Sequence, residues 1–193
     1  MGSNNPDGVE IKKHKGADGN PLDGIPIHPY YTVKDLCGVA FFLILFCAAV
    51  FFAPERGGYF LEHPNFEPAD PLKTPEHIAP VWYMTPYYAI LRAIPDKLLG
   101  VVAMGASIAV LFFLPWLDRG PVKSIRYRGP LYKAALSAFV FAFVTLGYLG
   151  VNVPTPGRTL LAQVCSVIYF AFFLLMPFYT KWDRTKPVPE RVT

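Results

Sequence analysis

The sequence predicts an all-α membrane protein with four transmembrane helices and a short interfacial helix in a long outer loop. Charged residues make up only 17% of the chain, whereas a soluble domain has about 25%. The deficit is concentrated in four runs without any Asp, Glu, Lys, Arg or His: 36–53, 98–117, 134–153 and 159–180. A helix of roughly 20 residues crosses a hydrocarbon core of about 30 Å. Buried helices of a soluble protein are the alternative, but so small a domain could not cover four of them.

The basic residues predict the orientation of these helices. Most of the 18 Lys and Arg residues lie before the first run, between the second and third, and after the fourth. The positive-inside rule therefore predicts that both termini lie in the cytoplasm. The expected location is a bacterial inner membrane. The chain would comprise a polar cytoplasmic arm at 1–35, a membrane domain at 36–180 with an outer loop at 54–97, and a cytoplasmic tail at 181–193.

The second half of the outer loop is apolar enough to enter a membrane. Proline is favoured in the first turn of a helix, so Pro86 predicts a short helix at 87–94 that lies at the outer face. Four aromatic residues gather around its start: Trp82, Tyr83, Tyr87 and Tyr88. They have two interpretations, an interfacial belt at headgroup depth or the wall of a quinone or lipid pocket. Composition alone favours the belt.

The histidines exclude one kind of cofactor site. A haem inside a helix bundle needs axial ligands, usually His, that project from the helices. The four histidines all lie outside the apolar runs, at His14, His28, His63 and His77. We therefore expect this chain to ligate neither haem nor another metal. Because ionisable residues inside a membrane mark ion paths, their absence from the runs also argues against a pump or an ion-coupled transporter.

Four segments carry a resemblance to a known family. The stretch 74–100, TPEHIAPVWYMTPYYAILRAIPDKLLG, closely resembles the quinol-site loop of cytochrome b in ubiquinol–cytochrome c oxidoreductase, complex III. PIHPYYTVKD at 26–35 resembles the segment that leads into the fifth helix of that protein, and LPWLD at 114–118 resembles the end of its sixth. GSNNP at 2–6 resembles the polar turn after its fourth helix. The resemblance implies the carboxy-terminal half, helices five to eight, without the half that carries both haems b.

The resemblance also implies two groups of site residues. The pocket for quinol oxidation would include Ile78, Pro80, Val81, Trp82, Tyr83, Tyr87, Tyr88 and Met104. The quinone-reduction site on the opposite face would include Ser3, Lys34 and Asp35. Without the resemblance, Lys34 and Asp35 would be interpreted as a solvated charge pair at a helix start.

Position 81 departs from the Pro-Glu-Trp-Tyr motif of the family. Val81 stands where the motif has Glu, and a valine side chain can neither hydrogen-bond a quinol hydroxyl nor accept its proton. Glu76 is the nearest carboxylate in the sequence and a candidate proton acceptor. An exposed loop charge is the simpler interpretation of Glu76.

The resemblance implies part of the cytochrome b subunit of a quinol:cytochrome c oxidoreductase in the respiratory chain, not catalytic alone. Quinone or quinol is the expected cofactor, with haem b bound by the amino-terminal half. The implied partners are that half, a cytochrome c-type subunit, a Rieske iron–sulfur protein and membrane lipid, in a dimeric complex; no nucleic acid is expected.

Two alternatives stay open. One is a non-catalytic membrane scaffold or assembly protein that retains the fold, which Val81 favours. The other is the separate carboxy-terminal subunit of a cytochrome bf-type complex. That subunit has three spans, so the fourth apolar run argues against it.

Overall fold

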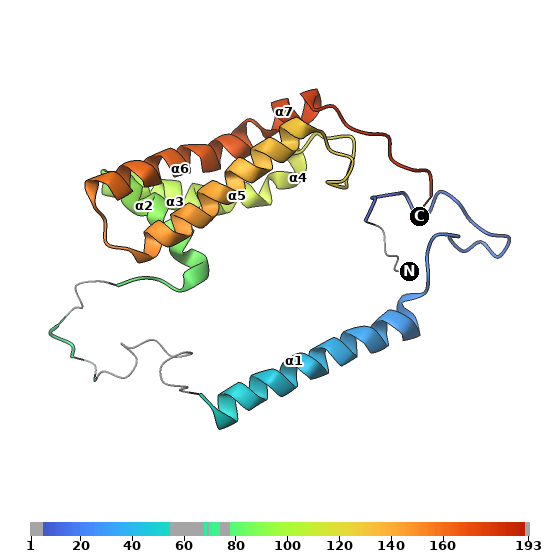
Figure 1. The fold of residues 1–193 in the computed structure, drawn as a ribbon, viewed down its shortest axis with the longest axis horizontal. Helices are drawn as coiled ribbons and strands as arrows, with labels where there is room; N and C mark the ends of the chain where they lie inside the picture. Colours follow the sequence, from blue (N-terminus) through green and yellow to red (C-terminus); the bar gives the residue numbers. More distant parts are fainter. Residues whose placement is uncertain (1–5, 55–67, 69, 74–77, 192–193) are drawn as a thin grey trace. The chain divides into compact units, whose positions relative to one another are not determined.

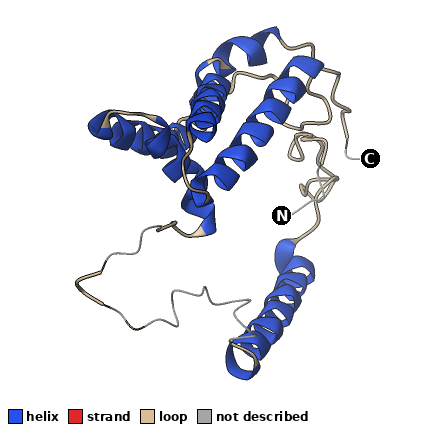
Figure 2. Cartoon of the chain, turned by 60° about the vertical axis from the view of Figure 1, so that its left-hand side comes forward, coloured by secondary structure: helices blue, strands red, loops and turns tan. Residues whose placement is uncertain are grey.

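The computed structural model describes residues 6–54, 68, 70–73 and 78–191. These residues form helices and no strand (Figure 2), which confirms the predicted all-helical fold. They separate into two units. One holds helix α1 and the polar arm before it; the other holds the remaining helices and the short stretch Pro6–Gly8.

Helix α1, Thr32–Phe52, follows a single turn of π-helix at Ile27–Tyr31. It begins before the apolar run that starts at position 36, so Lys34 and Asp35 lie in its first turn. No residue of α1 is buried. Together the π-turn and α1 form a stretch of 26 residues that is long and apolar enough to cross a membrane.

The second unit is built on a hairpin of two long helices, α5 (Pro130–Val151) and α6 (Pro156–Leu174), which run side by side in Figure 1. Each begins with a proline in its first turn, where the missing N–H needs no partner. Thr155 caps α6 by accepting a hydrogen bond from the Arg158 N–H at 3.4 Å. Both helices are long and apolar enough to cross a membrane.

Prolines break the second and fourth predicted runs near one end. Helix α3 (Lys97–Phe112) gives way to α4 (Leu114–Leu117), and α6 gives way to α7 (Met176–Trp182). Pro115 and Pro177 lack an N–H, and each ring conflicts with the carbonyl four residues earlier, so the helical ladder is interrupted one residue before each short helix begins.

Three of the described helical segments have the length and apolarity of a membrane span, and α3 is shorter. The count of four spans therefore stays a prediction. The short helix of the outer loop, α2, is at Thr85–Ala93, one to two residues ahead of the predicted range 87–94. Pro86 lies in its first turn, as expected.

The core of the second unit lies between α2, α5 and α6. Its buried residues include Ala89, Ile90, Ala93, Ala142, Leu146, Leu149, Ala162, Cys165, Tyr169 and Phe173. Aromatic rings fill the space between α5 and α6: Phe139 stacks on Phe172 with ring centroids 4.5 Å apart. The buried Tyr169 hydroxyl donates to the Ser107 carbonyl at 2.8 Å, which ties α6 to α3.

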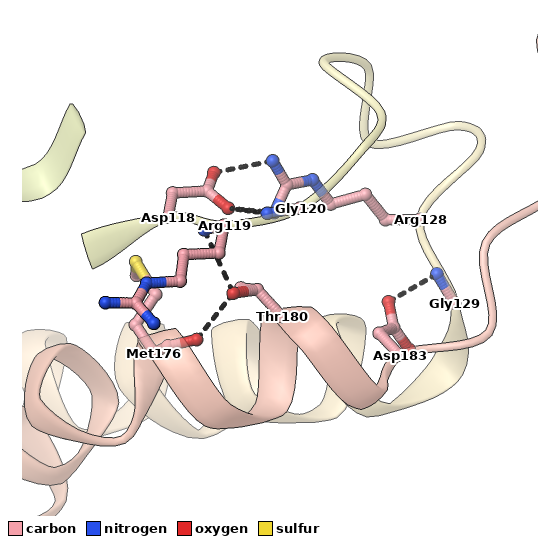
Figure 3. A network of polar contacts seen from close by, with 8 residues as sticks. All are labelled: Asp118, Arg119, Gly120, Arg128, Gly129, Met176, Thr180 and Asp183. Atoms are coloured by element: carbon pink, nitrogen blue, oxygen red, sulfur yellow. Dashed lines mark hydrogen bonds and ion pairs between the residues drawn. The ribbon is translucent and has the colours of Figure 1, made fainter. Parts of the chain in front are cut away.

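A polar network closes one end of this unit (Figure 3). Arg128 donates two hydrogen bonds to Asp118, at 3.0 and 2.5 Å. Asp183, just after α7, accepts from the Gly129 N–H at 2.7 Å. Any side chain at Gly129 would collide with the Asp183 carboxylate. The network therefore joins the ends of α4, α5 and α7 through one ion pair and through hydrogen bonds from backbone N–H groups to a carboxylate.

Burial alone would raise the pKa of the Asp118 carboxyl. The hydrogen bonds from Arg128 and the Gly120 N–H outweigh burial, so the pKa lies below its usual value. A carboxyl with a lowered folded-state pKa stabilises the fold above its unfolded-state pKa, and that contribution is lost as the pH falls through the folded-state pKa.

We therefore expect Asp118→Asn to lower the free energy of unfolding at pH 7 by roughly 1–3 kcal/mol, because Arg128 loses its charged acceptor. The difference should begin to shrink as the pH falls below the ordinary aspartate pKa of about 4 and should be lost below the lower folded-state pKa, where the wild-type carboxyl also becomes protonated. Thermal denaturation of the assembled protein over this pH range measures the effect, with the exposed Glu10→Gln as control. An equal effect at every pH would contradict the assignment.

Candidate functional site

The motif residues form a tight turn at the head of α2. Trp82–Met84 is a single 3₁₀ turn, in which the Met84 N–H donates to the Val81 carbonyl at 2.8 Å. The Thr85 hydroxyl donates to the Trp82 carbonyl at 2.7 Å and so joins the turn to the first residue of α2. Short-range hydrogen bonds thus fix the backbone of the motif.

The side chains of this turn point away from the core of their unit. Trp82 is 82% exposed, Tyr83 57% and Val81 52%. The two rings meet edge to face, with centroids 5.7 Å apart. Large apolar groups are therefore presented outward on a fixed backbone, available to a ligand, a lipid or another polypeptide.

The other predicted pocket residues are divided among different surroundings. Tyr87 is half-buried and meets Phe143 of α5 edge to face at 6.0 Å. Tyr88 lies under the guanidinium of Arg92, whose carbon is 4.8 Å from the ring centroid. Ile78 is exposed before the turn and Met104 is half-buried on α3. Tyr87 and Tyr88 thus lie on α2, directly after the turn, while Met104 lies on the neighbouring helix α3.

Helix α2 rests directly on the backbone of α5. At Gly150 an added Cβ would overlap the Thr85 carbonyl, and at Gly147 it would lie 3.7 Å from Pro86. Only glycine permits so close an approach at position 150. Sequence reasoning missed Gly150 and Thr85 because their proximity depends on how the helices pack.

An open apolar groove of about 530 Å³ runs between α2 and α6. Its lining comprises Ile90, Ala93, Ile94, Gln163, Ser166, Val167, Phe170, Ala171, Leu174 and Leu175. None of these residues was predicted to be part of a site. The sequence indicates this groove only indirectly, because α6 has apolar residues on other faces besides the one that packs on α5.

The predicted quinone-reduction residues lie in the other unit or outside the described residues. The Lys34 ammonium donates to the Tyr30 hydroxyl at 3.1 Å and lies 4.7 Å from the centroid of that ring. Asp35 is exposed beside it on α1. Ser3 and the candidate proton acceptor Glu76 lie outside the described residues.

The fold and site define a class: a helical membrane protein with a rigid aromatic turn in a long loop. Within the described part of the chain, no three His, Cys, Asp or Glu side chains are placed to hold a metal ion. Residues 68–170 match the family described as cytochrome b(C-terminal)/b6/petD. The chain therefore belongs to the carboxy-terminal cytochrome b family, which confirms the resemblance seen in the sequence.

Individual relatives support this family assignment. The chain is 58% identical to cytochrome b of Allochromatium vinosum over 201 aligned residues, which cover 100% of this chain and 49% of the relative. It is 44% identical to cytochrome b of Rhodospirillum rubrum, with 99% and 45% covered. Among solved structures, a hyperthermophilic respiratory complex III matches with a TM-score of 0.76 and 40% identity, over 94% of this chain and 44% of that one. The chain thus spans about half the length of the curated relatives it matches.

The contact between Gly150 and Thr85 yields a prediction. Gly150→Ala should push α2 away from α5, because the new methyl group would overlap the Thr85 carbonyl. Overpacking of this kind costs roughly 1–3 kcal/mol. The matched control is Gly105→Ala on α3, where an added Cβ meets nothing within 4 Å. If thermal denaturation of the assembled protein shows the same stability for both variants, α2 does not rest on α5 in this way.

Proposed function

We propose that this chain is the carboxy-terminal part of cytochrome b in a quinol:cytochrome c oxidoreductase, where it forms one wall of the quinol-oxidation pocket. The observation that carries the proposal is the exposed aromatic turn Trp82–Met84, fixed at the head of α2. Rigid aromatic rings with a few polar groups suit a flat quinol headgroup. Lys34 and Asp35, with Ser3, would form part of the quinone-reduction site.

The redox centres would be held elsewhere. The four apolar runs, 36–53, 98–117, 134–153 and 159–180, contain no histidine that could ligate a haem. Haem b would be bound by the amino-terminal half, which accords with a chain about half as long as its relatives. A cytochrome c-type subunit and a Rieske iron–sulfur protein would complete the path of electrons, in a dimeric complex. The chain itself shapes and orients the quinone sites and is not catalytic alone.

The proposed topology has four spans in a bacterial inner membrane. Helices α3 and α4 together would form the second span despite the break at Pro115. Helix α2 would lie at the outer face, opposite the basic segments at the cytoplasmic ends of the spans. In this topology the quinol-oxidation pocket would lie near the outer membrane surface, and the quinone-reduction site would lie near the cytoplasmic surface.

Quinol oxidation releases two electrons and two protons, so the pocket needs a route for the protons. Val81 cannot accept a proton, and the family's usual acceptor is absent from this position. A tyrosine of the loop, an ordered water or another carboxylate such as Glu76 would serve instead. Val81 also favours the second candidate function, a scaffold that keeps the fold without oxidising quinol. Quinol:cytochrome c turnover of the purified complex distinguishes the two functions.

Tyr88→Ala tests the pocket wall. We expect quinol oxidation to slow by roughly tenfold, which corresponds to about 1.4 kcal/mol of lost interaction with the ring. Haem content should stay normal, because Tyr88 lies outside the buried core. The matched control is Tyr148→Ala, which removes a tyrosine that is 63% exposed on α5. Normal turnover in Tyr88→Ala at full haem content would count against the pocket.

Val81→Glu tests the proton route. Since a placed general base contributes about 10²–10⁴-fold in rate, we expect this variant to oxidise quinol faster in a Glu76→Gln background. Its rate should rise with pH through the titration of the new carboxyl. Glu76→Gln alone identifies the native acceptor: a large loss of rate assigns Glu76, and an unchanged rate and pH profile leaves the tyrosine or water route. No gain from Val81→Glu would argue against a proton route at position 81.

A further inference from the structure

Arg92 connects α2 to the carboxyl end of α5. Its Nη2 atom donates to the carbonyl of Leu149 at 2.5 Å and to that of Asn152 at 2.9 Å. The last carbonyls of a helix lack partners within the helix and carry a partial negative charge. These hydrogen bonds and the partial negative charge of the helix end therefore favour the half-buried guanidinium in this position.

The same guanidinium also holds a residue of the proposed pocket. Its carbon lies 4.8 Å from the centroid of the Tyr88 ring, one helical turn earlier on α2. This is the distance of a cation–π contact, and the planar guanidinium covers the ring as it bonds to α5. The orientation of Tyr88 is thus linked to the end of a long helix.

Helix α2 is held at two further points. The Gln163 side-chain amide of α6 donates to the Ala93 carbonyl at 2.9 Å, at the last residue of α2. At the other end, Thr85 lies against Gly150. These contacts fix the helix backbone, whereas Arg92 fixes the backbone and touches a pocket ring as well.

We propose that Arg92 is a positioning residue for quinol oxidation: it sets the orientation of Tyr88 by tying that ring to the carboxyl end of α5. The inference rests on the proposed function of the pocket. Lysine cannot replace it, because an ammonium group lacks the planar face that covers the ring while its edge donates to two carbonyls.

The test uses the assembled complex with four variants: Arg92→Lys, Tyr88→Leu, the double variant and Arg158→Lys. The last is the matched control, since Arg158 is also a half-buried arginine and donates to the Val153 carbonyl at 3.0 Å. We expect Arg92→Lys to raise the KM for quinol by about tenfold with a smaller change in kcat, as for a lost binding contact. Arg158→Lys should leave both constants unchanged.

The double variant separates a positioning role from a general loss of stability. If Arg92 acts through Tyr88, the double variant should be no worse than the worse single variant. Effects on KM that simply multiply would overturn the inference, as would a wild-type KM in Arg92→Lys. Because KM does not depend on the amount of enzyme, the KM of Arg92→Lys still tests the inference when this variant assembles in lower yield. A wild-type complex that does not oxidise quinol would instead refute the proposed function.

Discussion

The contact between the backbones of α2 and α5 is the constraint on which the rest of the site depends. Gly150 lets the Thr85 carbonyl approach α5 more closely than any other residue would allow. Thr85 in turn bonds to the Trp82 carbonyl, so the position of the aromatic turn follows from the packing of the helix behind it. Arg92 and Gln163 hold the far end of α2. A short loop helix of nine residues, too short to be stable alone, becomes a rigid support through these contacts.

The sequence was sufficient for features that depend on local composition. The absence of charge predicted apolar helices, three of which have the length of a membrane span, and Pro86 predicted where α2 begins. Both signals act within one segment. The break at Pro115 was also visible in the sequence, but counting apolar residues ignores the missing N–H. The bonds of Arg92 to Leu149 and Asn152 were not predictable, since they join residues roughly 60 positions apart and depend on how α2 crosses α5. The residues of the proposed pocket came from the family resemblance, since no local pattern in the sequence indicates them.

The two ends of the second unit are stabilised by different kinds of interaction. At the α2 end, close backbone packing leaves the aromatic side chains free, with Trp82 and Tyr83 exposed. At the other end, Asp118, Arg128 and Asp183 join three helix ends through charged hydrogen bonds (Figure 3). Charged groups at helix ends stabilise the unit without entering the apolar layer, where their desolvation would be costly. The division suits the proposed role, in which one end binds an uncharged ring and the other keeps the helices in register.

The groove between α2 and α6 has a consequence for how such a protein is handled. Its walls are almost wholly apolar, and in a bilayer a hollow of this kind is filled by acyl chains or by a neighbouring helix, because leaving it empty would forfeit dispersion contacts. Extraction replaces that filling with detergent tails of different length and stiffness. Since Ile90 and Ala93 of α2 form part of the wall, the choice of detergent acts directly on the helix that carries the aromatic turn. Acyl chains that fill this groove would contact α2 directly, so removing lipid during purification would change the surroundings of that helix.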